Sequence, residues 1–118
     1  MRTICTLLVA ATVAPAAVAA AASTVSPKLL GTVGPGFTIS LKQNGKPVRT
    51  LKPGPYTFVV SDKASIHDFH LSGPGLSRVL TGVGFTGTKT ATITLKRGTY
   101  SYKCDVHPTT MRGTFRVA

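Results

Sequence analysis

Short stretches with apolar residues at every second position dominate the sequence after residue 23. In segments 37–41 and 91–95, the alternation places the apolar side chains on one face of a β-strand. No segment after Ser23 shows the three-to-four-residue period of an amphipathic helix, and glycine or proline separates most of the stretches. About seven short strands at this spacing predict an all-β, antiparallel sandwich or barrel.

The expected strands can be placed along the chain by their composition and by the turns between them. Asn44-Gly45 follows the first strand and is typical of a tight hairpin turn. Segment 51–58 resembles segment 95–102, and both contain a glycine turn followed by an aromatic strand, so we expect the same corner to be built twice. The expected strands are 37–41, 56–60, 66–71, 91–95, 99–104 and 113–117.

The N-terminal segment has the layout of a secretory signal peptide. Residues 1–22 combine Arg2, a mostly apolar run over residues 4–14 and an alanine-rich end. A membrane anchor is the alternative, but the run is short and is followed by Pro15, whereas a spanning helix needs about 20 apolar residues. We therefore expect a signal peptide over 1–22, one mature domain over 23–118, and export to the periplasm, the cell surface or the medium.

The cysteines and the charge limit the chemistry of the mature chain. Cys5 lies in the expected signal peptide, so Cys104 has no internal disulfide partner, and a bound metal would explain an unpaired thiol in an exported protein. The formal net charge is +11, with 14 Lys and Arg residues against three acidic residues, all Asp. The cations are scattered rather than interleaved with aromatic residues, which favours an acidic partner or an anionic surface over nucleic acid.

A thiol, a thioether and two imidazoles form a candidate metal site. Cys104 ends an expected strand, His107 and Met111 follow within one short loop, and two further histidines, His67 and His70, lie on a separate expected strand. Two imidazoles, a thiolate and a weak thioether are the ligands of a blue copper site, whereas zinc seldom recruits methionine and calcium prefers oxygen.

The spacing Cys104-x-x-His107-x-x-x-Met111 after an aromatic strand, with His67-Asp68-Phe69 upstream, resembles the cupredoxins, the small blue (type 1) copper proteins such as plastocyanin, amicyanin and pseudoazurin. The resemblance covers about residues 37–117. It implies a Greek-key cupredoxin-like fold and one copper ion that cycles between Cu(I) and Cu(II). It also implies that His67, Cys104 and His107 are ligands and that Met111 is the axial ligand.

Two residues depart from that family pattern. Asp68 replaces the asparagine that commonly follows the first histidine, and an ionised carboxylate accepts hydrogen bonds but donates none. His70 is an additional histidine, and residues three apart on a strand face opposite ways, so only one of His67 and His70 can face Cys104. The family pattern favours His67, and we expect His70 to be a surface or supporting residue and Asp105 a solvated loop residue.

Simpler interpretations exist for each residue taken alone. Cys104 could be a small buried apolar residue, His107 an exposed loop residue and Met111 core filler. A cysteine nucleophile with a histidine partner is the enzymatic alternative, but the sequence offers no third orienting residue, so we expect no catalytic residues.

The sequence therefore predicts a monomeric, non-enzymatic one-electron carrier. By the resemblance, the edge of His107 is the port to a redox partner protein, and the basic surface favours a partner with an acidic docking surface. Copper storage or delivery outside the cytoplasm is the alternative function, and a β module without metal is the third.

Overall fold

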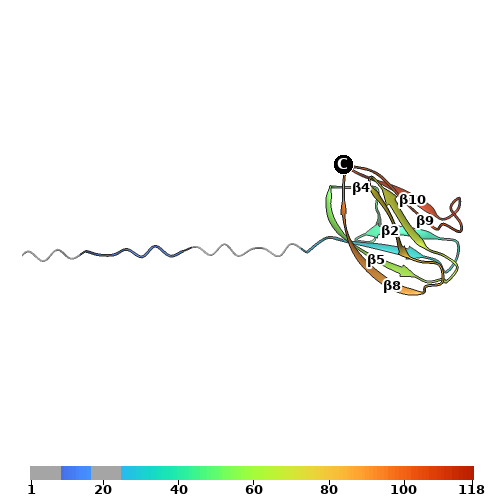
Figure 1. The fold of residues 1–118 in the computed structure, drawn as a ribbon, viewed down its shortest axis with the longest axis horizontal. Helices are drawn as coiled ribbons and strands as arrows, with labels where there is room; N and C mark the ends of the chain where they lie inside the picture. The colour runs from blue at the N-terminus through green and yellow to red at the C-terminus, as the bar shows by residue number, and fades with distance from the viewer. Residues whose placement is uncertain (1–8, 17–24) are drawn as a thin grey trace, which may run out of the picture.

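Figure 1 shows the protein as a computed structural model that describes residues 9–16 and 25–118. The expected signal peptide lies largely outside the described residues, and its described part, residues 9–16, forms neither helix nor strand. The described residues form ten strands and no helix. Residues 9–16 and 25–118 therefore contain no helix that is long and apolar enough to cross a bilayer.

The first of two sheets has the strand order β3-β2-β1-β5-β8. Asn44 and Gly45, with φ angles of 50° and 78°, form the tight turn between β2 and β3, as the Asn-Gly pair predicts. Strands β1 and β5 are parallel, and the other neighbours are antiparallel. The strands are β1 (Lys28–Val33), β2 (Ile39–Gln43), β3 (Lys46–Pro47), β5 (Gly54–Asp62) and β8 (Gly87–Leu95).

The second sheet has the strand order β4-β10-β9-β6-β7 and packs on the first as a sandwich. Among the described residues, its one parallel pair joins β4 and β10. The strands are β4 (Thr50–Leu51), β6 (Phe69–Gly73), β7 (Leu76–Thr81), β9 (Gly98–Lys103) and β10 (Arg112–Val117).

The expected sandwich is confirmed, with antiparallel pairing between most neighbouring strands and two parallel pairs that the sequence did not indicate. Parallel neighbours need a connection of about a dozen residues or more, because the chain must return to the same end of the sheet. Residues 34–53 provide that connection between β1 and β5, and residues 52–111 provide it between β4 and β10. These long-range pairings leave no local signal in the alternation of apolar residues.

The core lies between the two sheets. Burial alternates along β5, where residues 56, 58, 60 and 62 are buried and their neighbours are more exposed. Each fully buried large apolar side chain contributes about 1.5–3 kcal/mol to folding. The largest fully buried apolar side chains come from both sheets: Leu29, Val33, Leu41, Phe58, Val60, Phe69, Leu71, Leu95, Tyr100, Met111 and Phe115.

The repeated segment forms the same corner twice, as the sequence predicts. The Tyr56 hydroxyl donates a 2.7 Å hydrogen bond to the backbone oxygen of Lys52, and the Tyr100 hydroxyl donates one of 3.1 Å to that of Lys96. Each bond fixes the start of a long strand, β5 or β9, to the turn before it. Strand β9 then leads directly to Cys104 at the opposite end of the sandwich.

Gly113 tests how tightly the second sheet is packed. It pairs with Tyr102 across β9 and β10, and a Cβ atom on Gly113 would overlap the Tyr102 ring. Overpacking of this kind costs about 1–3 kcal/mol, so Gly113→Ala should lower the unfolding midpoint in urea and in heat. The control is Gly82→Ala, because a Cβ there meets nothing within 4 Å. Equal losses in the two variants would contradict this account of the packing.

Candidate metal centre

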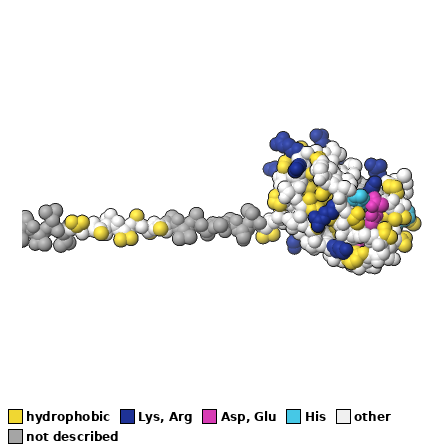
Figure 2. Space-filling view, in the orientation of Figure 1, with side chains coloured by type: hydrophobic (Ala, Val, Ile, Leu, Met, Phe, Trp, Pro, Cys, Tyr) yellow, Lys and Arg dark blue, Asp and Glu magenta, His cyan; other side chains and the backbone are white. Residues whose placement is uncertain are grey.

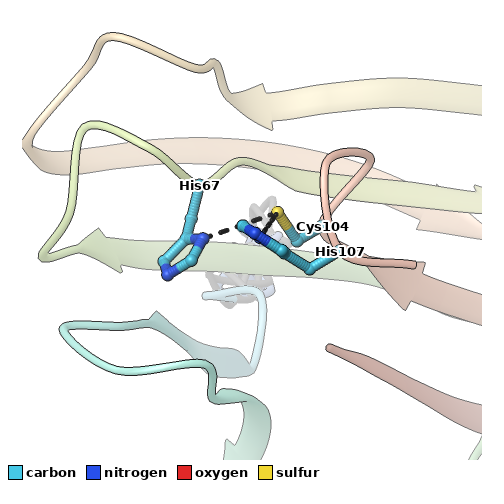
Figure 3. Close-up of side chains that lie close together, drawn as sticks. All are labelled: His67, Cys104 and His107. Atoms are coloured by element: carbon cyan, nitrogen blue, oxygen red, sulfur yellow. Dashed lines mark hydrogen bonds between the residues drawn. The ribbon is translucent and has the colours of Figure 1, made fainter. Parts of the chain in front are cut away.

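Three candidate metal-binding side chains meet at one end of the sandwich (Figure 3). Cys104 directly follows β9, and His107 lies in the loop between β9 and β10. His67 lies in the loop that leads from β5 into β6, and β6 pairs with β9. The pairing of β6 with β9 therefore brings together residues that lie far apart in the sequence.

Backbone hydrogen bonds fold the loop after Cys104 back on itself. The N–H of His107 donates to the oxygen of Cys104 at 3.2 Å, and the N–H of Met111 donates to that of His107 at 2.9 Å. The N–H of Cys104 donates to the oxygen of Met111 at 2.9 Å, which closes the loop. Met111, at the end of this loop, has a fully buried side chain.

The sulfur of Cys104 faces a nitrogen of each histidine. Its Sγ atom is 3.8 Å from Nδ1 of His67 and 3.8 Å from Nδ1 of His107. One donor atom from each of the three residues lies within 4.8 Å of the other two. Cys104 and His67 are fully buried, whereas His107 is partly exposed.

This spacing fits a metal ion held between the three donors. With bonds of about 2.3 Å to sulfur and about 2.0 Å to nitrogen, donors about 120° apart would be separated by about 3.8 Å. One thiolate and two imidazoles in a trigonal arrangement are a donor set that suits copper. The arrangement is therefore consistent with a single copper ion.

Comparison with known proteins gives the fold. A rusticyanin variant of known structure is 24% identical, with a TM-score of 0.53 over 77% of this chain and 76% of that one. Auracyanin A, a "blue" copper protein from Chloroflexus aurantiacus, is 15% identical, with a TM-score of 0.52 over 77% of this chain and 98% of that one. The chain has a cupredoxin fold. No protein-family model matches the sequence, and no curated protein matches it significantly.

Within the cupredoxin fold, the two upstream histidines face different surroundings, as expected. His67 points to Cys104, whereas Nδ1 of His70 lies 2.9 Å from a carboxylate oxygen of Asp105 and Nε2 lies 2.8 Å from the hydroxyl of Ser77. The reason differs from the expected one, because β6 begins at Phe69 and His67 belongs to the preceding loop.

Asp68 joins the two loops of the candidate metal centre. One oxygen of its carboxylate accepts a 2.6 Å hydrogen bond from the backbone N–H of Asp105, next to Cys104. Asp105 also contacts His70 and lies 3.9 Å from the amine of Lys103, so it is not the merely solvated residue that the sequence predicts. An aspartate can thus provide the acceptor of a loop-to-loop bond at this position.

The two carboxyl groups titrate in opposite directions. Burial raises the pKa of Asp68 above its usual value of 3.8, and its side-chain hydrogen bond with Asp105 raises that pKa further. Partial burial raises the pKa of Asp105. Its hydrogen bonds with Asp68 and His70 together lower that pKa by more, so the pKa of Asp105 lies below its usual value of 3.8. The pKa of Asp68 is therefore the higher of the two.

Phe37 contacts both histidines, which the sequence did not reveal. Its ring packs edge-on against both imidazoles, with a distance between ring centroids of 4.8 Å to His107 and 5.6 Å to His67. The alternation suggested that Phe37 lies on the apolar face of a strand, but β2 begins at Ile39 and Phe37 is 61% exposed. The Gly-Pro-Gly sequence over residues 34–36 is the signal for this loop.

Asp68 gives the metal-free protein a defined pH dependence. The pKa of Asp68 is raised in the folded state, so the folded protein binds a proton at Asp68 more tightly than the unfolded chain does. Asp68 therefore favours folding most below pH 3.8 and less as the pH rises through its raised pKa. Urea unfolding should show Asp68→Asn gaining stability over wild type as the pH rises from about 3 to 7. Asp105→Asn should lose stability over the same range, because the pKa of Asp105 is lowered. A difference from wild type that stays constant with pH in both variants would contradict the assignment.

Proposed function

We propose that the protein is an exported one-electron carrier with a single type 1 copper ion held by His67, Cys104 and His107, and by Met111 as a weak axial ligand. The observation that carries this proposal is the convergence of Cys104 Sγ with Nδ1 of both histidines from two separate loops. Copper bound there supplies a couple between Cu(I) and Cu(II).

The chain's own residues favour electron transfer over chemistry on a substrate. His67 and Cys104 are fully buried, and the side chain of Met111, at the end of the loop after Cys104, is fully buried as well. Burial excludes water and substrates from these donors, and the closed loop holds the ligand residues in place through a change of oxidation state. Asp68 lies next to a ligand, and its negative charge, where ionised, favours the oxidised ion.

His107 is the proposed route for the electron, because it alone of the three converging residues is partly exposed. Exposed apolar side chains occupy the loops at this end of the sandwich, and they offer a surface for a redox partner. Lys63 and Lys103 also lie at this end and favour acidic groups at the edge of the partner's surface. The exposed apolar residues are Phe37, Ile66, Val83 and Val106.

Export is the part of the proposal that rests on sequence alone. Residues 1–22 have the composition of a signal peptide, and removal of that segment leaves Cys104 without another thiol in the chain. An oxidising compartment would destroy a free exposed thiol, whereas a buried and metal-bound one is protected. The mature protein is proposed to act as a monomer in the periplasm or outside the cell.

Copper titration tests the site directly. One equivalent of Cu(II) added to the purified protein should give an intense blue thiolate-to-copper band. Cys104→Ser should abolish the band and weaken copper binding by at least about tenfold. Ser101→Ala, on the preceding strand, is the matched control and should keep the band. A blue band that survives Cys104→Ser would contradict the proposal.

Replacing the axial residue tests its role and separates electron transfer from copper carriage. Met111→Leu should keep the blue colour and raise the reduction potential by on the order of 60 mV, a tenfold change for a one-electron couple. The wild-type protein should keep its copper through repeated reduction and oxidation in the presence of a chelator. Release of the copper to the chelator within a few cycles would favour storage or delivery instead.

A further inference from the structure

The acidic side chains all lie at the metal end of the sandwich. Asp62 ends β5, Asp68 precedes β6, and Asp105 follows β9. These are the chain's three acidic residues, since it has no glutamate. Figure 2 shows acidic side chains on the part of the domain away from the point where the N-terminal segment enters.

The opposite end of the sandwich carries a cluster of cations. Gly54 pairs with Leu95, so Lys52 and Lys96 lie at the same end of the first sheet, and Arg97 precedes the start of β9. All three cations are exposed. We call them the basic end. Other exposed cations lie on the same half of the domain: Lys28, Lys42, Lys46, Arg49 and Arg116.

The charges of the basic end are available to a partner. Among residues 9–16 and 25–118, the ion pairs are His70 with Asp105 and Lys103 with Asp105, both at the metal end. The cations of the basic end therefore have no carboxylate side chain to neutralise them within the described chain. Their charge is directed into solvent, where it attracts an anionic surface over about 10 Å at 0.1 M salt.

The basic end also carries an apolar hollow, and the chain enters the sandwich beside it. The backbone oxygen of Pro27 accepts a 2.8 Å hydrogen bond from the N–H of Thr57, which fixes the entry point next to β5. Val25 at this point is 84% exposed. The hollow has a volume of about 310 Å³ and is lined by Val25, Ser26, Pro27, Pro53, Gly54, Pro55 and Tyr56.

We propose that the basic end docks on a membrane surface of anionic phospholipids, with the metal end facing away. Clustered lysine and arginine side chains bind anionic headgroups. At the metal end, the exposed carboxylate of Asp105 lies 3.9 Å from the amine of Lys103 and offsets its charge, so the reverse orientation is less favourable. The basic end is built from turns and short strand ends around an apolar hollow. The tyrosines beside its cations, Tyr56 and Tyr100, are buried, so they are not free to stack on the bases of a nucleic acid. Docking in this orientation would leave His107 free to meet a partner while the protein stays near the membrane.

Vesicle sedimentation with matched charge variants tests the proposal. The purified protein should bind phosphatidylcholine vesicles that contain about a quarter phosphatidylglycerol, but not pure phosphatidylcholine, and about 0.5 M salt should release it. Simultaneous Lys52→Gln, Lys96→Gln and Arg97→Gln should weaken binding by at least about tenfold. The control variant combines Lys63→Gln, Arg78→Gln and Lys89→Gln, which removes the same charge elsewhere on the domain and should weaken binding by less than about threefold.

The outcomes separate a docking surface from general attraction by net charge. Equal weakening in the two triple variants, or no binding to the anionic vesicles, would overturn the proposal. Binding to a short DNA duplex that is tighter than to the vesicles would overturn it as well. The single variants Lys52→Gln and Lys96→Gln should each give a smaller loss in the same direction, which keeps the test valid if the triple variant folds poorly.

Discussion

The hydrogen bond from the backbone N–H of Asp105 to the carboxylate of Asp68 joins the two loops that carry the candidate donors. His67 is the neighbour of Asp68, and Cys104 is the neighbour of Asp105, so the bond fixes the approach of the histidine to the sulfur. The bond is 2.6 Å long, and the carboxylate that accepts it is buried. Charge-assisted bonds of this kind are about twice as strong as neutral ones.

The sandwich supports this junction from a distance. The hydrogen bonds of the Tyr56 and Tyr100 hydroxyls fix the starts of β5 and β9 at one end of the sandwich. Both strands then lead to the metal end. Packing of the two inner faces leaves the strands little freedom to shift, because protein interiors are close-packed. One end of the molecule is thus occupied by turns and cations, and the other by short loops whose side chains are fixed by the strands before them.

Much of the site could be predicted from the sequence because its chemistry is local. Cys104, His107 and Met111 lie within one short segment, and their types specify a soft metal site wherever the loop folds back. The preference for His67 over His70 needed a family resemblance, because the expected strand over residues 66–71 does not exist at His67. The role of Phe37 could not be found from alternation, since the same pattern fits a strand and a loop that packs on the histidines.

The fold was predicted less completely for a physical reason. In the sequences of β1 and β7, apolar and polar residues do not alternate regularly, and the burial of these strands depends on neighbours that are distant in the chain. The parallel pairs of β1 with β5 and of β4 with β10 form only after long connections have closed, so no short segment encodes them.

X-ray absorption at the copper edge of the protein loaded with one equivalent of copper tests the donor set most directly. The account predicts one sulfur neighbour at about 2.2–2.3 Å and two imidazole nitrogens at about 2.0 Å, with the sulfur signal absent in Cys104→Ser. A first shell of nitrogen and oxygen alone in the wild-type protein would contradict it.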